Sequence, residues 1–265
     1  MISPSDIEYI RSRGTTEEKI ARQIDRFRRG ATALTLDRPA TVGDGIVRVA
    51  EDEKPRLAAL HDEAARAGRC LKFVPASGAA TRMFKDWHAV LNRGGFASRA
   101  EFDAFAENLP RYAFYGDLRE VLSRAGRVEA KPGAVGAERE VLDFILNDRG
   151  LNYACKPKAL LKFHWYADAA RTALEEHLVE AALYVKDGQG LCRVHVTVSA
   201  EHLEPVREWI RLVRGGHEQR LGVRYDIGLS VQSESTDTIA VDLDNRPFRA
   251  RDGRLLFRPG GHGAL

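Results

Sequence analysis

Hydrophobic positions recur with a helical spacing in the N-terminal part of the chain. Ile20, Ile24 and Phe27 fall on one face of an amphipathic segment that follows a capping sequence. A second helix is predicted over 53–67, where the pattern stops at a glycine. We therefore expect residues 1–69 to form a helical lead-in to the rest of the chain.

The hydrophobic pattern changes after this lead-in. Short apolar or alternating segments predict β-strands over 71–74, 193–198 and 223–231. Longer segments with apolar positions near one face predict helices over 166–185 and 201–213, and a short helix starting within 238–241. Strands that alternate with helices are typical of α/β layers, so we expect an α/β fold for residues 70–265.

A polar stretch separates the first predicted strand from the later ones. Residues 84–151 are interrupted by several glycines and prolines, and we interpret them as a mostly helical insertion. The sequence ends directly after the glycine-rich turn 258–263. Turns of this kind normally lead into another element, and we therefore expect this α/β domain to be incomplete at residue 265.

Composition narrows the class of protein. The chain has 265 residues with 41 Lys and Arg against 38 Asp and Glu, which favours neither nucleic acid nor an acidic partner. It has no apolar run of membrane-spanning length and no signal-peptide pattern. Three isolated cysteines, Cys70, Cys155 and Cys192, make no disulfide framework, which indicates a cytoplasmic protein. Nothing in the pattern favours one oligomeric state.

Small residues follow the first predicted strand and end in a threonine and an arginine. The segment is Ala76, Ser77, Gly78, Ala79, Ala80, Thr81 and Arg82, with Lys85 just beyond it. Small residues let backbone N–H groups approach an anion, and an arginine adds a fixed fork of donors, so the segment suits a polyphosphate. The alternative is a strand-to-helix turn in which the small residues only pack.

Two later positions offer further polar chemistry. Lys158 follows Pro157, whose stiff backbone would project the lysine as a point positive charge. Gln232 lies just past a predicted strand, where open α/β sheets place ligands, and its amide could read a nucleobase edge beside Thr236. The alternatives are an exposed basic turn and a polar loop that caps a helix.

Two further candidates lie near the C-terminus. Glycines surround a histidine at Gly260, Gly261, His262 and Gly263, and such a backbone could lie against a flat ligand, although a disordered tail end is the alternative. Asp242 and Asp244 could hold a divalent cation through carboxylate oxygens. A solvated turn is the commoner role for such a pair.

These segments, taken in order, resemble the signature of the sugar-nucleotide pyrophosphorylases. In that family a strand leads to a loop of the form Gly-Gly-x-Gly-Thr-Arg-Met/Leu, and a Pro-Lys step before Leu-Leu follows. Residues 77–83 match the loop and 157–161 match the step, while 258–263 resembles the Pro-Pro-Gly-His-Gly segment of the uridine-diphosphate-sugar branch. Ser77 and Ala80 replace two signature glycines. The whole chain also resembles a bacterial family, domain of unknown function 4301.

The resemblance implies both a fold and an activity. The fold would be a Rossmann-like, GT-A nucleotidyltransferase-type sheet, mostly parallel and flanked by helices. The activity would join a sugar 1-phosphate to a nucleoside triphosphate, with UTP favoured, and release pyrophosphate; Mg²⁺ would bridge the phosphates. Arg82, Lys158 and Lys85 would then stabilise charge, and the other candidates above would bind nucleotide or sugar. The alternative is an inactive protein of the same fold that binds or senses a nucleotide sugar.

Overall fold

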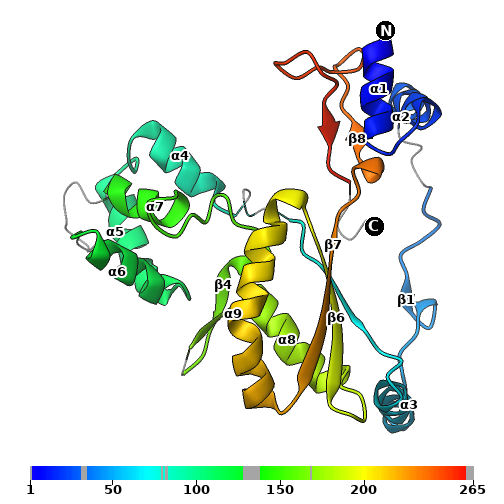
Figure 1. Cartoon of the computed structure of the whole chain (residues 1–265), viewed down its shortest axis with the longest axis vertical. Helices are drawn as coiled ribbons and strands as arrows, with labels where there is room; N and C mark the ends of the chain where they lie inside the picture. Colours follow the sequence, from blue (N-terminus) through cyan, green and yellow to red (C-terminus); the bar gives the residue numbers. More distant parts are fainter. Residues whose placement is uncertain are drawn as a thin grey trace.

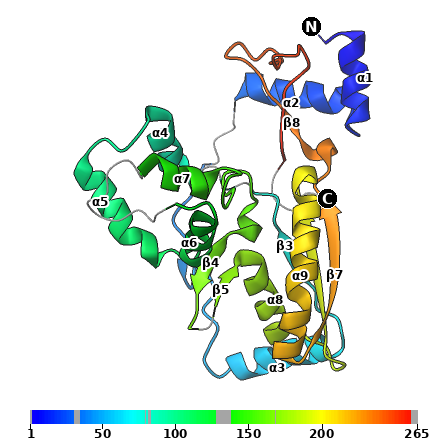
Figure 2. The ribbon, with the colours of Figure 1, turned by 60° about the vertical axis from the view of Figure 1, so that its left-hand side comes forward.

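The computed structural model describes residues 2–30, 35–78, 80, 83–127, 138–167 and 169–260. A three-stranded parallel sheet with the order β3-β6-β7 lies at its centre (Figure 1). The strands are β3 (Lys72–Pro75), β6 (Leu191–Val198) and β7 (Arg224–Val231). The two helices that connect them, α8 (Ala173–Tyr184) and α9 (Leu203–Leu221), lie together on one face of the sheet (Figure 2).

The sheet buries one face against these helices because its apolar residues alternate along each strand. The register places Val74 beside Val196 and Val196 beside Leu229. Val196 is fully buried in a core that also contains Leu178 of α8. Tyr225 is buried there as well, and its hydroxyl donates to the Leu178 carbonyl oxygen at 2.7 Å. This bond satisfies the polar end of a large buried side chain.

The opposite face of the sheet is polar and partly open. The ring of Phe73, 42% exposed, stacks on His195 with centroids 5.5 Å apart. His195 Nε2 lies 2.8 Å from the Ser230 hydroxyl, which also lies 3.1 Å from the Thr197 hydroxyl. A short chain of hydrogen bonds therefore joins β6 and β7 on this face.

The segment that the sequence analysis interprets as an insertion contains helices that share a hydrophobic core and form a helical lobe. Its helices are α4 (Lys85–Arg93), α5 (Arg99–Asn108), α6 (Tyr115–Arg124) and α7 (Glu138–Leu146), with the 3₁₀ turn η1 (Leu109–Arg111) after α5. Phe102, Leu118 and Leu142 are fully buried at its centre. The chain returns to the sheet through the 3₁₀ turn η2 (Lys158–Leu160) and the antiparallel hairpin of β4 (Lys162–Trp165) and β5 (Ala170–Thr172).

The N-terminal helices form a third unit with the end of the chain. Its elements are α1 (Pro4–Ser12), α2 (Glu17–Arg29), the 3₁₀ turn η4 (Glu234–Thr236), β8 (Thr238–Ile239) and β9 (Phe257–Arg258). Ile10, Ile20 and Ile24 pack there against Ile239 and Leu255. The helix α3 (Lys54–Arg66) lies apart from them, at the opposite end of the sheet (Figure 1). The remaining short elements are β1 (Thr41–Val42), β2 (Gly45–Ile46) and the 3₁₀ turn η3 (Ala200–His202).

The mixed α/β class is confirmed, but some local predictions are wrong. The helix expected over 166–185 begins only at Ala173, because Thr172 and Glu175 form a capping box there. The residues before it form the β4–β5 hairpin instead. The short helix expected at 238–241 is the strand β8, because Ile239 pairs with Phe257, a partner distant in sequence.

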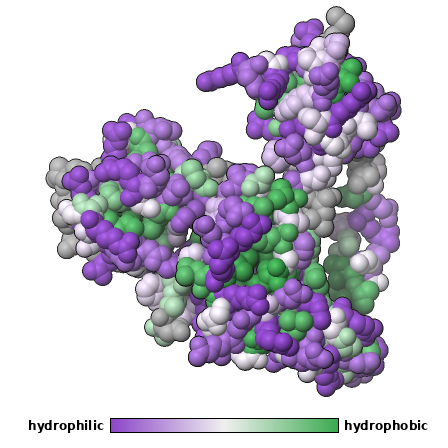
Figure 3. Space-filling model, in the orientation of Figure 1, coloured by the Kyte–Doolittle hydropathy of each residue, from purple (hydrophilic) through white to green (hydrophobic). Residues whose placement is uncertain are grey.

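Hydrophobic side chains gather on the surface over α9 and the adjoining sheet edge (Figure 3). Ile210 of α9 and Ile227 and Leu229 of β7 form the apolar walls of a groove there. Among the described residues, no helix is long and apolar enough to cross a bilayer.

Candidate functional site

The three central strands end side by side at one edge of the sheet. The Ala76 amide, just past β3, donates to the Thr197 carbonyl at 2.7 Å. The Gln232 amide, just past β7, donates to the Val198 carbonyl at 2.8 Å. Open α/β sheets bind ligands at this carboxyl edge. The small-residue segment that begins at Ala76 and the segment around Gln232 therefore lie at the edge where the sequence predicts a ligand.

The small-residue segment and the Pro-Lys step meet at a single cavity. The Lys158 amide donates to the Gly78 carbonyl oxygen at 3.1 Å, although the two residues are distant in sequence. A cavity of about 240 Å³ lies beside this bond. Its lining comprises Val74, Pro75, Ala76, Gly78, Lys158, Ala159, Ala173 and His177. Lys158 and His177 are the ionisable residues of this lining, and no carboxylate is among the described lining residues.

Local backbone geometry explains why Lys158 projects. Pro157 is extended, with φ −66° and ψ 151°, and precedes the η2 turn. Ala159 and Leu160 are buried in the core below the sheet, whereas Lys158 is exposed. The buried neighbours anchor the turn, and within the described residues the ammonium group of Lys158 has no ion-pair partner. Its charge is therefore free to meet a ligand.

His177, which the sequence analysis did not predict as a site residue, also lines this cavity. Its Nδ1 lies 3.3 Å from Glu180 Oε2, one turn along α8. Glu180 also forms an ion pair with the buried Lys72 of β3, which is bonded to the Tyr184 hydroxyl too. Burial alone would lower the pKa of Lys72, but its bonds to Glu180 and Tyr184 outweigh burial and raise it. The bond from Lys72 likewise lowers the pKa of Glu180, so this carboxylate stays charged beside His177.

The segment around Gln232 and the segment that begins at Gly260 also contact each other. The Gln232 side-chain nitrogen donates to the Gly260 carbonyl at 2.9 Å, and the Gly260 amide donates to Asp237 Oδ1 at 3.0 Å. A Cβ at Gly260 would lie 2.7 Å from Thr236 Oγ1, so only glycine fits this approach. Asp237 also accepts from Arg13 Nη2 at 2.6 Å. This turn is therefore held by its own side chains and by Arg13, the C-cap residue of helix α1.

The Lys158–Gly78 contact and the Gln232–Gly260 contact both lie near the carboxyl ends of strands of the same sheet. Neighbouring strands are about 4.8 Å apart, so Ala76 and Gln232, two strands apart, lie about 10 Å from each other along the edge. The sequence predicts the candidate segments one by one. Only the structure shows which residues meet in each of the two clusters.

A family model described as Domain of unknown function (DUF4301) matches residues 3–265. The chain belongs to this family. Neither the curated proteins nor the solved structures contain a match. The family that the sequence predicts is confirmed, whereas the likeness to pyrophosphorylases stays a prediction.

The other predicted site residues of this DUF4301 protein have different surroundings. Ala80 is fully buried in the core of the helical lobe, Ser77 and Gly78 are half-buried, and Lys85 is exposed at the start of α4. The remaining predicted residues lie outside the described part of the chain: Ala79, Thr81, Arg82, Gly261, His262 and Gly263.

The predicted metal pair forms a turn. Asp242 Oδ1 accepts from the amides of Asp244 and Arg246 at 2.9 Å each, and the Asp244 carboxylate lies 3.5 Å from the Arg246 guanidinium. Within the described ranges no three His, Cys, Asp or Glu side chains gather as metal ligands. These two residues do not fit a protein-held magnesium ion, and no step is assigned to one.

Proposed function

We propose that this DUF4301 protein is a nucleotidyltransferase of the Rossmann-like GT-A type. It joins a sugar 1-phosphate to a nucleoside triphosphate, with UTP favoured, and releases pyrophosphate. The observation that supports this most directly is the backbone bond between Lys158 and Gly78 beside a cavity that Lys158 helps to line. The two segments that resemble the pyrophosphorylase loop and Pro-Lys step are distant in sequence and contact each other near the carboxyl edge of the parallel sheet.

The reaction needs positioning and charge stabilisation more than covalent help from the protein. A phosphate oxygen of the sugar 1-phosphate attacks the α-phosphorus, the bond to the β-phosphate oxygen breaks, and pyrophosphate leaves. Lys158 stabilises the charge that develops on the phosphates, and the glycine at 78 allows the backbone to approach them. We assign Arg82 and Lys85 to the phosphate tail, from the resemblance alone.

A second candidate function is nucleotide-sugar binding without turnover. Ser77 and Ala80 occupy positions where the signature has glycine, and the burial of Ala80 in the helical lobe favours a structural role for part of the loop. Both candidates use the same cavity. We expect either function in a reducing cytoplasm, where the cysteines at 70, 155 and 192 stay free.

Pyrophosphate release with UTP and a panel of sugar 1-phosphates tests the proposal. We expect Lys158→Gln to lower the rate by about a hundredfold, because a cation that stabilises transition-state charge is lost. Lys186→Gln is the matched control, since Lys186 is an exposed lysine before β6, at the opposite end of the strand.

The outcomes separate the two candidates. If the unmodified chain binds nucleotide sugars through Lys158 but releases no pyrophosphate with any substrate, the chain is a binding protein. If Lys158→Gln changes neither turnover nor binding, the cavity is not the site and both candidates are wrong.

A further inference from the structure

A second cavity lies between the helical lobe and the β4 hairpin. Its volume is about 320 Å³. Aromatic side chains from both sides line it, among them Trp87 of α4, Tyr112 after η1 and Phe163 of β4. Asp86, Arg111 and Lys162 contribute the charged part of the lining. Apolar walls with a few polar groups, placed between two lobes, are typical of small-molecule sites.

Some of the aromatic rings that line this cavity are partly open to solvent. Tyr112 is 37% exposed and Phe163 is 42% exposed. The Trp87 and Tyr112 rings meet edge to face with centroids 5.5 Å apart, and Tyr112 stacks on Phe114 at 5.2 Å. Packed neighbours thus fix the Tyr112 ring while one part of it stays exposed. A flat ligand would cover this exposed aromatic surface.

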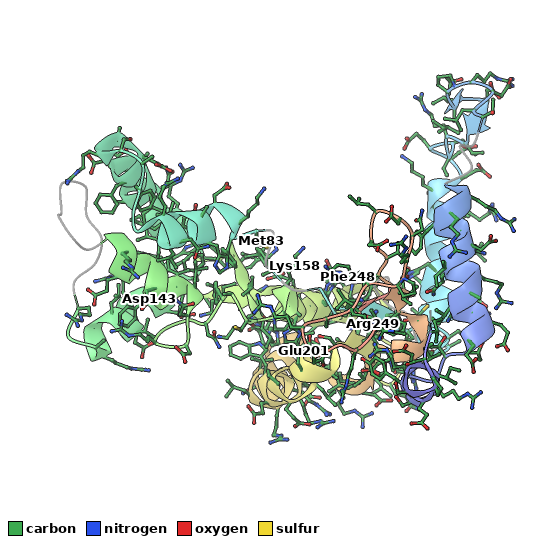
Figure 4. The ribbon with its side chains drawn as sticks, turned by 90° about the horizontal axis from the view of Figure 1, so that it is seen from above. Met83, Asp143, Lys158, Glu201, Phe248 and Arg249 are labelled. Atoms are coloured by element: carbon green, nitrogen blue, oxygen red, sulfur yellow. The ribbon has the colours of Figure 1, made fainter. Side chains whose placement is uncertain are left out.

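The aromatic cavity is close to the cavity that Lys158 helps to line. Leu161, in its wall, directly follows η2, and the 3₁₀ rise places it about 6 Å along the chain from Lys158. Met83, also in its wall, is five residues beyond Gly78, at most about 18 Å away. Seen from above, Met83 and Lys158 both project between the helical lobe and the central part of the molecule (Figure 4). One nucleotide can therefore reach from Lys158 into the aromatic cavity.

We propose that the aromatic cavity binds the nucleobase of the nucleotide whose phosphates lie at Gly78 and Lys158. Bases stack on aromatic side chains regardless of sequence, because every base has a flat π-face. The Asp86 carboxylate accepts hydrogen bonds and the Arg111 guanidinium donates them, so together they can pair with a base edge. The side-chain nitrogen of Gln232, by contrast, already donates a hydrogen bond to the Gly260 carbonyl oxygen. The helical insertion is therefore part of the ligand site.

The proposal rests on the proposed function only for the position of the phosphates. Calorimetric titration of the full chain with UTP and with inorganic pyrophosphate tests it. Phe163→Ala and Tyr112→Ala are each expected to weaken UTP binding about tenfold, by loss of stacking, and to leave pyrophosphate binding unchanged. Trp165→Ala is the matched control, because Trp165 is an exposed aromatic of the same strand that does not line the cavity.

The outcomes distinguish this inference from the proposed function. Failure of Lys158→Gln to weaken pyrophosphate binding contradicts the phosphate site, whereas the two aromatic variants still test the base site through UTP. Unchanged UTP affinity in both aromatic variants overturns the inference. So does a tenfold loss of sugar 1-phosphate affinity without a loss for UTP, which would assign the cavity to the sugar. Loss of pyrophosphate binding in the aromatic variants would show a general structural effect and would also overturn it.

Discussion

At the scale of single residues, a glycine permits the side-chain arrangement on the open face of the sheet. A Cβ at Gly228 would lie 2.9 Å from His195 Nδ1. The His195 ring is held by its stack on Phe73 and by its contact with Ser230, so it has little freedom to move away. Strand β7 therefore needs a residue without a side chain at this position.

Gly228→Ala is expected to lower the free energy of unfolding by about 1–3 kcal/mol, because the extra methyl group displaces a packed ring. Urea denaturation followed by circular dichroism measures the change. An unchanged unfolding midpoint would show that the His195 ring moves aside without cost.

Asp6 is a residue whose charge state should influence stability. It is buried and accepts two hydrogen bonds from Arg249, at 2.8 and 2.7 Å. The Arg249 guanidinium holds the pKa of Asp6 well below its usual range; burial opposes this shift, and bonds from Ser3 support it. The unfolded chain binds a proton at Asp6 near pH 4, where the folded chain stays ionised.

The stabilisation from Asp6 is therefore complete above about pH 4 and is lost as the pH falls through the folded pKa. Melting temperatures between pH 6 and pH 2.5 test this expectation. Asp6→Asn should be less stable than the unmodified chain at pH 6, and the difference should shrink on acidification. A difference that stays constant with pH contradicts the assignment.

At the scale of elements, helix α9 is longer than its sequence pattern indicates. The pattern predicts a helix that stops at 213, before Gly215 and Gly216, but α9 continues to Leu221. It ends at Gly222, which has the left-handed φ of 61°. Helix α9 packs against β7 and α8, and this packing stabilises the helical conformation at Gly215 and Gly216 although glycine is a poor helix former.

Space around these two glycines allows a stabilising change. Apart from the chain neighbours and the nearby backbone of the helix itself, no described atom lies within 4 Å of a Cβ built at Gly215 or Gly216. We expect Gly215→Ala to raise the free energy of unfolding by about 0.5–1 kcal/mol, since alanine loses less backbone entropy in a helix. Differential scanning calorimetry measures it as a higher melting temperature. Gly222→Ala is the contrasting variant and should destabilise, because alanine is strained at this φ.

At the scale of the whole molecule, the described residues form three separate hydrophobic cores. One lies in the helical lobe, one lies under the sheet, and one joins α1 and α2 to β8 and β9. The third core connects the two ends of the chain, and ion pairs such as Arg13 with Asp237 reinforce it. The segment around Gln232 and Gly260 therefore depends on the N-terminal helices for its position.

Ile20→Ala tests this dependence. Ile20 is fully buried in the third core, and its truncation should cost about 2–5 kcal/mol of local stability. Limited proteolysis should then cut both the N-terminal helices and residues 233–260 faster, while the helical lobe keeps its resistance. Leu118→Ala in the helical lobe is the reciprocal control. Equal sensitisation of all three units by Ile20→Ala would show that the chain unfolds as one body.

The sequence by itself determined the elements that depend on local physics. Helical spacing after a capping sequence predicted α2, alternation predicted β6, and the glycine and proline breaks led us to interpret residues 84–151 as a helical insertion. It also identified the family and the two ends of strands where ligands are expected. These features can be predicted from neighbouring residues in the sequence, because caps, turns and periodic burial depend on residues only a few positions apart.

Only the tertiary structure decided which of these residues meet. Lys158 contacts Gly78, Gln232 contacts Gly260, and β8 exists because β9 pairs with it. His177 and the aromatic cavity carry no sequence pattern of their own, since a histidine on a helix and scattered aromatic residues are compatible with an ordinary core. Contacts between residues distant in sequence depend on how whole helices and strands pack. The local spacing of hydrophobic residues does not specify this packing.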